Sequence, residues 1–296
     1  MSDFAEQFFR NAALALKEER NVDVYEETMQ ICREGEYVAQ SGTRIKLRPN
    51  AEVLAASVFY DNPPVAESAT SSGGSEVDVV NSDCIDVAHE LVREGFHPIL
   101  LNMANRHKPG GGVLFGANAQ EETLFRRSNL CVSLYQYSGP YAKFLSLPKG
   151  NGAYPMNRET GGVYSGLVTF FRADSAHDFA LVDDPFECAV VSVAAINQPE
   201  CESPDRLAKW AADASKVKIR SMLRIGLLHG HDAIVLGAWG CGAFGNPPTH
   251  MAELFKEVLT EGEFFGRYRR VRFAIIEDEN SRNLNYGSFA KVFGHE

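Results

Sequence analysis

The sequence of 296 residues lacks long hydrophobic runs. Its longest apolar stretches, such as Ala189 to Ile196, are far shorter than the roughly 20 residues that cross a bilayer. The amino-terminal residues MSDFAEQFFRN lack both the basic start and the apolar core of a signal peptide. We therefore expect an intracellular protein without a membrane partner, which is cytoplasmic or, in a eukaryotic cell, nuclear.

The sequence also lacks the patterns from which common metal and nucleophile sites are built. Its six cysteines and eight histidines are scattered, without a Cys-x-x-Cys or an HExxH pattern. This spacing argues against zinc fingers and against a dense disulfide framework. No Gly-x-Ser-x-Gly nucleophile elbow is evident. We predict reduced cysteines and a reaction that needs no metal and no cofactor.

Positive charge is scarce, because 29 Lys and Arg stand against 39 Asp and Glu, for a net charge of -10. A broad grip on duplex DNA requires a basic face that releases counterions, so we expect no direct binding of duplex DNA. The deficit does not exclude a diphosphate ligand. Helix amino termini and turned loops can bind phosphate through backbone amides alone.

Short apolar runs bounded by turn residues predict the strands of a buried sheet. His97 to Leu101, Cys188 to Asn197 and Ala233 to Leu236 are typical of parallel strands that are covered on both faces. Stretches with helical spacing separate these runs, so the sequence predicts an α/β fold. We expect one domain over residues 1–296, with residues 1–40 forming a helical extension that packs on it.

Other stretches are assigned by their periodicity. Val77 to Val80 predicts a strand that leads into a helix ending at Gly95. Val53 to Phe59 clusters apolar residues in the manner of a strand. Leu207 to Leu228 predicts a long helix, with Trp210 on the face that enters the core.

The most informative stretch runs from Asn102 to Arg127, NMANRHKPGGGVLFGANAQEETLFRR. Gly110 to Gly112 can adopt positive φ and let the backbone approach a ligand closely. Ala119 to Tyr137 is expected to be a single helix. Gln120 to Glu122 would lie in its first turn, where free amides and the helix dipole favour anions or sugar oxygens. Each feature alone also fits a flexible loop and solvated glutamates, but their combination indicates a site.

The spacing GGG, seven residues, then QEE matches the signature loop of the poly(ADP-ribose) glycohydrolases. The wider phrase ANRHKPGGGV...GANAQEETLFR resembles their bacterial and fungal type, most specifically here and more loosely towards both ends of the chain. The resemblance implies a three-layer α/β/α macrodomain-like sandwich with a mixed sheet, which binds ADP-ribose. It also implies catalysis by Glu122, with Glu121 and Gln120 holding ribose hydroxyls.

Polar residues follow two of the predicted strands. Asp83 lies at the carboxyl end of its strand, where it could cap the next helix; the resemblance implies instead that it accepts a hydrogen bond from the adenine amino group. The resemblance also implies that Asn105 binds ribose, and Asn102 is the second candidate for this role. The alternative is an asparagine that satisfies its own turn.

A second glycine cluster, GCGAFG, follows the strand that ends at Leu236 and formally matches the dinucleotide pattern GxGxxG. The chain that follows has room for only one more strand and not for a doubly wound nucleotide domain, and the first acidic residue after that strand comes well past the roughly 20-residue offset expected. The same string resembles the diphosphate loop of macrodomains. The resemblance implies that Phe244 packs against the ribose, whereas a loop aromatic in the core is the alternative.

We therefore expect hydrolysis of the ribose-ribose glycosidic bonds of poly(ADP-ribose), with ADP-ribose as product. Two alternatives stay open: a hydrolase acting on mono-ADP-ribosylated proteins or acylated ADP-ribose, and a reader that binds ADP-ribose without turnover. The role of residues 148–185 also stays open. The implied substrate-binding residues are Asp83, Cys84, Ile85, Asn102, Asn105, Gly110, Gly111, Gly112, Val113, Gln120, Gly240, Cys241, Gly242, Ala243, Phe244 and Gly245.

Overall fold

The computed structural model describes residues 3–65, 73–277 and 284–294, with side chains from residue 14 onward. A seven-stranded sheet forms its centre. The strands are β3 (Ser57–Tyr60), β4 (Glu76–Val80), β5 (Pro98–Met103), β6 (Gly162–Arg172), β7 (Leu181–Val193), β10 (Ala233–Leu236) and β11 (Arg270–Ala274).

The sheet is mixed, with the order β3-β6-β7-β5-β10-β11-β4. The strands from β7 to β4 in this order run parallel, whereas β6 is antiparallel to both β3 and β7. The carboxyl ends of the parallel strands therefore meet at one edge, where open α/β sheets bind their ligands. The loops that carry the predicted site residues follow β4, β5 and β10 at this edge.

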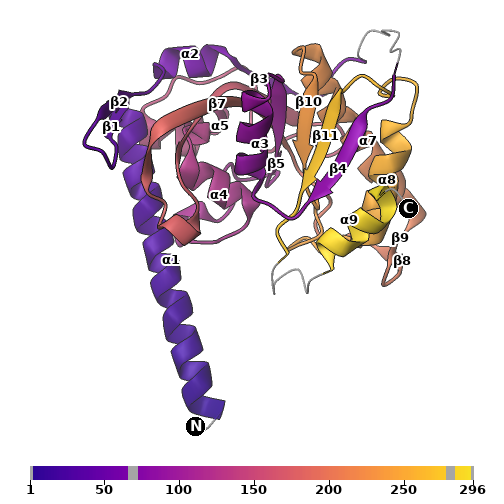
Figure 1. Cartoon of the computed structure of the whole chain (residues 1–296), viewed down its shortest axis with the longest axis horizontal. Coiled ribbons are helices and arrows are strands. Elements are labelled where there is room, and N and C mark those ends of the chain that lie inside the picture. The colour runs from indigo at the N-terminus through magenta and orange to yellow at the C-terminus, as the bar shows by residue number, and fades with distance from the viewer. Residues whose placement is uncertain (1–2, 66–72, 278–283, 295–296) are drawn as a thin grey trace.

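Helices cover both faces of the sheet, with α3, α4 and α5 on one face and α7, α8 and α9 on the other (Figure 1). The expected three-layer α/β/α arrangement with a mixed sheet is therefore confirmed. The α-helices are α1 (Asp3–Glu34), α2 (Asn50–Ala55), α3 (Cys84–Arg93), α4 (Gln120–Arg127), α5 (Leu130–Tyr135), α6 (Gly139–Ala142), α7 (Lys209–Leu228), α8 (Pro248–Leu259) and α9 (Asn285–Phe293). The 3-10 helices and small strands are η1 (Val113–Phe115), η2 (Lys143–Leu145), η3 (Ser175–His177), β1 (Glu36–Val38), β2 (Arg44–Lys46), β8 (Cys201–Ser203) and β9 (Arg206–Leu207).

The apolar side chains of β5 pack into two separate hydrophobic cores. Ile99 and Leu101 belong to the cluster under α7 and α8, whereas Leu100 belongs to the cluster under α3 and α4. Successive side chains of a strand point to opposite faces, so a strand covered on both sides must be apolar throughout. The prediction of a buried parallel strand here is confirmed.

The amino-terminal helix α1 extends beyond the body of the protein at its beginning and packs against it at its end (Figure 1). Leu14 and Leu16 are exposed. Further along, the buried Asn21 donates from Nδ2 to the Gly116 carbonyl over 2.9 Å, and the buried Thr28 donates to the Arg126 carbonyl over 2.7 Å. The second half of α1 therefore supports the back of α4. None of the described helices is long and apolar enough to cross a membrane.

The prediction of one helix over Ala119 to Tyr137 is wrong, because the chain breaks between α4 and α5. Ser128 is extended (φ -150°) and bridges to Phe170 of β6. The side chain of Asn129 accepts from the Thr169 amide over 2.8 Å. Pairing with the part of β6 that β3 does not reach thus competes with helical bonding at these two residues, and the apolar periodicity on either side hides this break.

Two further expectations need correction. The stretch Val53 to Phe59 is not one strand, since α2 extends to Ala55 before β3 begins. Trp210 is not a core residue, because it is 49% exposed and its indole nitrogen donates to Glu200 over 2.7 Å. Ala211, the next residue, is already fully buried, so Trp210 lies beside the core face of α7 and not on it.

Candidate active site

The first turn of α4 places two buried carboxylates against the glycine loop. Glu121 is 4% exposed; its Oε1 accepts from the Gly110 amide over 3.1 Å and its Oε2 from the Asn105 amide over 2.7 Å. Burial raises the pKa of Glu121 to about 8; the Asn105 amide opposes this shift and the Glu122 charge adds to it. Glu121 therefore favours its protonated form at neutral pH.

Glu122 is 7% exposed and is held at both oxygens. Its Oε1 accepts from the Gly112 amide over 2.8 Å, and its Oε2 accepts from the Ala119 amide over 3.1 Å. The second contact is half of a capping box, in which the third helical residue reaches back to the amide before the helix. Glu122 is thus fixed in place by the helix start and by the loop at once.

The glycines make room for these carboxylates. Gly110 and Gly111 have φ of +82° and +55°, and a Cβ at Gly111 would collide with Glu122 Oε1. A Cβ at Gly110 would lie 2.7 Å from the ring of Phe125. The close approach predicted for this loop is therefore first of all an approach to the protein's own glutamates. Val113 ends the loop as a core residue, 1% exposed.

The two predicted asparagines take different positions. Asn102 is fully buried at the end of β5, and its Nδ2 donates to Ser192 Oγ over 3.0 Å and to Glu121 Oε1 over 3.4 Å. Asn105 accepts from the amides of His107 and Lys108 over 2.9 and 3.1 Å, so its oxygen satisfies its own turn. Its Nδ2 donates to none of the described residues, which leaves that donor available to a ligand.

The Gln120 amide is occupied by protein atoms. Its Oε1 accepts from the Met103 amide over 2.9 Å, and its Nε2 donates to the Leu101 carbonyl over 2.6 Å. Nε2 also lies 3.6 Å from Cys84 Sγ, which places the half-buried Cys84 beside the start of α4. Gln120 therefore joins α4 to the end of β5.

Asp83 caps α3 and also makes an ion pair. Its Oδ1 accepts from the Ile85 amide over 2.8 Å and from Arg127 Nη1 over 2.9 Å. The Arg127 side chain is only 3% exposed, so this pair is well shielded from water. Oδ2 accepts no hydrogen bond from the residues that the structure describes. Ile85 contributes a buried side chain and an amide that is already engaged.

The second glycine cluster forms an exposed loop after β10. Within the described chain, the amides of Gly242, Ala243 and Phe244 have no acceptor. Successive free amides of this kind suit a phosphate group. Phe244 is half-buried and belongs to neither hydrophobic core, so the alternative of a core aromatic is not favoured. The neighbouring Cys241 is half-buried, and Gly245 is exposed.

Asn246 holds this loop and was not singled out from the sequence. Its Nδ2 donates to the carbonyls of Gly240 and Ile196 over 3.0 and 2.8 Å, which ties the loop to the segment after β7. Gly240 has φ +79°, and a Cβ there would lie 2.6 Å from Asn246 Nδ2. The position of Asn246 directly before Pro247 and Pro248 could have indicated this role. The ion pair of Arg127 with Asp83 was also missed, and no local pattern could have indicated it, because the two residues lie 44 positions apart.

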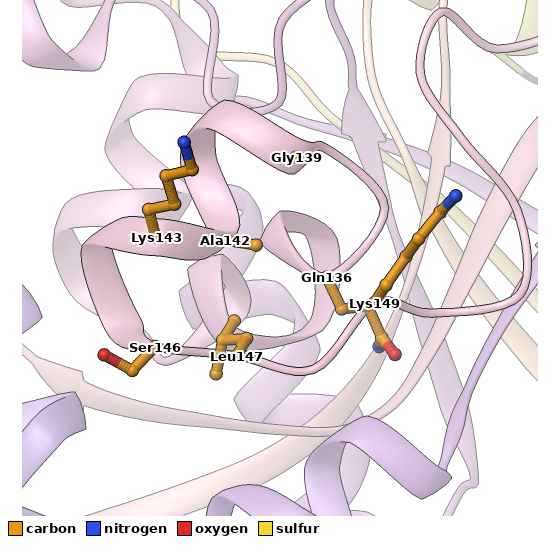
Figure 2. A pocket seen from close by; sticks show the side chains of 7 residues that line it. All are labelled: Gln136, Gly139, Ala142, Lys143, Ser146, Leu147 and Lys149. Atoms are coloured by element: carbon orange, nitrogen blue, oxygen red, sulfur yellow. The ribbon is translucent and has the colours of Figure 1, made fainter.

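A cavity of about 460 Å³ lies apart from these loops (Figure 2). It opens around α6 and η2, between the side chains of Lys143 and Lys149, with Gln136 and Leu147 in its wall. None of the predicted site residues lines it. The candidate site is therefore defined by its hydrogen bonds and free amides.

The described residues contain no group of three or more His, Cys, Asp or Glu side chains that could hold a metal ion. All six cysteines are free thiols. They range from the exposed Cys201 to Cys32, Cys131 and Cys188 in the interior.

Known proteins share the sequence and the fold. The family described as microbial-type PARG, catalytic domain, matches residues 25–173. The poly(ADP-ribose) glycohydrolase (PARG) of Thermomonospora curvata is 27% identical with a TM-score of 0.77, covering 92% of this chain and 99% of that one. The same enzyme in complex with the inhibitor ADP-HPD is 27% identical with a TM-score of 0.72, covering 92% of this chain and 98% of that one. The Deinococcus radiodurans PARG in complex with ADP-ribose is 25% identical with a TM-score of 0.67, covering 84% of this chain and 99% of that one. No match to a curated protein was found.

The mixed sheet between two helical layers is the fold shared with these enzymes, and the family and structural matches together define a glycohydrolase. The match over about half of the chain, together with the likeness to solved structures over most of it, is specific. The chain belongs to the family of microbial-type poly(ADP-ribose) glycohydrolases.

Proposed function

We propose that this protein hydrolyses the ribose-ribose O-glycosidic bonds of poly(ADP-ribose), releases ADP-ribose, and uses Glu122 as acid and base without a metal. The observation that carries the proposal is the carboxylate pair, which the loop amides hold at the carboxyl edge of the sheet. The T. curvata enzyme with ADP-HPD and the D. radiodurans enzyme with ADP-ribose support this class of ligand.

The reaction needs one proton delivered and one removed. Glu122 protonates the departing ribose oxygen as the bond from that oxygen to the anomeric carbon breaks and an oxocarbenium-like centre develops. Glu122 then takes a proton from water as the water oxygen bonds to the anomeric carbon. The acid form of Glu122 is thereby restored.

The remaining residues bind and orient the substrate. The free amides of Gly242, Ala243 and Phe244 bind the diphosphate, whose charge also stabilises the developing cation. Asn105 Nδ2 and Glu121 bind ribose hydroxyls, and Asp83 Oδ2 accepts from the adenine amino group. Gln120 acts as a positioning residue, because its amide is already committed to β5.

Two other functions compete with this proposal. A hydrolase of mono-ADP-ribosylated protein or acylated ADP-ribose would use the same pair on a different bond. A reader of ADP-ribose would need the amide loop and Asp83 but not a buried carboxylate beside the scissile bond. The carboxylate pair therefore favours catalysis over reading.

One assay separates the three functions. The protein is incubated with poly(ADP-ribose) and, separately, with mono-ADP-ribosylated protein, and the products are identified by chromatography and mass spectrometry. We expect free ADP-ribose from the polymer. Release from the mono-modified protein alone would favour the first competitor, and binding of ADP-ribose with no product from either substrate would favour a reader.

A further inference from the structure

Arg126, near the end of α4, is a buried arginine without an acidic partner. It is 0% exposed, and its guanidinium forms no ion pair with the residues that the structure describes. Burial lowers the pKa of Arg126 to about 10, and the charge of Glu122 opposes this shift, so the group stays charged at neutral pH. A cation taken out of water destabilises the fold unless its donors are well satisfied, so the contacts of this guanidinium are informative.

Both hydrogen bonds of the guanidinium are made to the loop that precedes α4. Nη1 donates to the Ala117 carbonyl over 2.8 Å, and Nη2 donates to Asn118 Oδ1 over 2.9 Å. Side chains of a helix point back towards its beginning, which lets Arg126 reach this loop. We call these two hydrogen bonds the Arg126 clamp.

The clamped loop ends at an amide that holds the catalytic carboxylate. Ala119 directly follows Asn118, and its amide donates to Glu122 Oε2 over 3.1 Å. The Ala117 amide donates to the carbonyl of Gly112 over 3.3 Å, and the amide of Gly112 donates to Glu122 Oε1 over 2.8 Å. The Arg126 clamp therefore fixes the piece of chain that joins the two amides on which the Glu122 oxygens rest.

Other contacts leave the guanidinium and the loop little room to move. From α1, Asn21 Nδ2 donates to the Gly116 carbonyl over 2.9 Å and Thr28 donates to the Arg126 carbonyl over 2.7 Å. The buried ring of Phe179 has its centre 5.7 Å from the guanidinium carbon. The position of the Arg126 side chain is thus set by packing, and the loop follows it.

We propose that Arg126 is a positioning residue for hydrolysis, which acts through Asn118 and the Ala117 carbonyl to keep the loop amides in place around the Glu122 carboxylate. This inference rests on the proposed function. A carboxylate that gives up and takes back a proton in each turnover has to return to one position, because a small displacement of a reacting group lowers the rate strongly. Arg126 is fully buried, so it acts through the loop and not on the substrate.

The test changes Asn118, whose exposed side chain can be replaced with little risk to folding. Asn118→Leu keeps a side chain of similar size and removes the acceptor, whereas Asn118→Asp keeps an acceptor for Arg126. Asn151→Leu is the matched control, because it makes the same change at an exposed asparagine whose side chain has no hydrogen bond to the described residues. The kcat on poly(ADP-ribose), the affinity for ADP-ribose and the melting temperature are measured for each variant.

We expect Asn118→Leu to lower kcat by about tenfold, as a small misplacement of a reacting group does. Its affinity for ADP-ribose and its melting temperature should match those of Asn151→Leu. Asn118→Asp should recover most of the lost turnover. Arg126→Met removes both donors and should lower kcat further, by about 10²-fold. Adding Asn118→Leu to Arg126→Met should then cause little additional loss, because the two residues share one hydrogen bond.

Three results would overturn the Arg126 clamp and leave the proposed function intact. They are equal kcat values in Asn118→Leu and Asn151→Leu, equal losses in Asn118→Leu and Asn118→Asp, and a loss in Asn118→Leu that affinity and melting temperature share. The Asn118 variants give this answer even where Arg126→Met does not fold. Absence of ADP-ribose release from the polymer by the unsubstituted chain would instead overturn the proposed function, and this inference with it.

Discussion

The Gly112 amide donates to Glu122 Oε1 over 2.8 Å, so the glycine loop holds one oxygen of the carboxylate to which we assign proton transfer. The neighbouring Glu121 is held by other amides, those of Gly110 and Asn105. Two adjacent glutamates are thus fixed by different donors. Substitutions can therefore test them separately.

Glu122→Gln should abolish most turnover while binding persists. Glutamine keeps the shape of the side chain but can neither donate an acid proton at neutral pH nor act as a base. We expect hydrolysis of poly(ADP-ribose) to fall by at least roughly 10²-fold, with affinity for ADP-ribose within a few fold. Single-turnover kinetics and calorimetry measure the two effects. A smaller loss in Glu122→Gln than in Glu121→Gln would reverse the assigned roles.

The stability of the protein should depend on pH through Glu121. Its pKa rises from the ordinary value of 4.5 to about 8 on folding. Its contribution to the free energy of unfolding is therefore complete below pH 4.5 and is lost as pH rises through about 8. Glu121→Gln should be the more stable protein at pH 8, by on the order of a few kcal/mol. Denaturant unfolding at pH 5 and pH 8 checks this; equal pH dependence in both proteins would contradict the shift.

Asp83→Ala should weaken both the fold and ligand selection. It removes the cap of α3 and leaves Arg127 buried without its closest partner, so we expect a loss of roughly 1–3 kcal/mol in stability. The preference for ADP-ribose over inosine diphosphate ribose should narrow, because the acceptor for the adenine amino group is gone. Asp86→Ala is the control, since Asp86 is exposed and lies farther from Arg127, at 3.6 Å. Calorimetry showing an unchanged preference would remove Asp83 from the adenine site.

Gly111→Ala should impair catalysis in a folded protein. The added Cβ would displace the Glu122 carboxylate, and φ of +55° is unfavourable for alanine by about 1 kcal/mol. We expect turnover to fall by more than about tenfold, as expected for a displaced catalytic group. Gly139→Ala, at a glycine with no atom within 4 Å of its added Cβ, should leave both activity and melting temperature unchanged. Wild-type turnover in Gly111→Ala would show that the carboxylate tolerates displacement.

The features that could be predicted are those that depend only on neighbouring residues in the sequence. The strands β5 and β10 and the glycine loops depend on apolar runs and turn residues that lie close together in the chain. The partner of a polar side chain is not local information. The hydrogen bonds of the Gln120 amide, for example, join it to the end of β5, which comes close only when the sheet has formed.

The break between α4 and α5 shows the same limit. No glycine or proline at or beside Ser128 and Asn129 indicates a helix end, and the apolar residues on both sides keep helical spacing. The cause is an edge of β6, more than 30 residues away, that accepts and donates backbone hydrogen bonds there. Tertiary pairing outweighs helix propensity at such a position.

The two halves of α1 imply a boundary for limited proteolysis. Leu14 and Leu16 are exposed, whereas the Glu18 backbone already packs so closely on Gly116 that no side chain fits there. A protease should therefore trim the chain up to about this point and then stop. We expect a chain that begins at Lys17 to keep its melting temperature and its activity. A chain that begins at Glu34 should lose the contact of α1 with the Arg126 carbonyl and should aggregate.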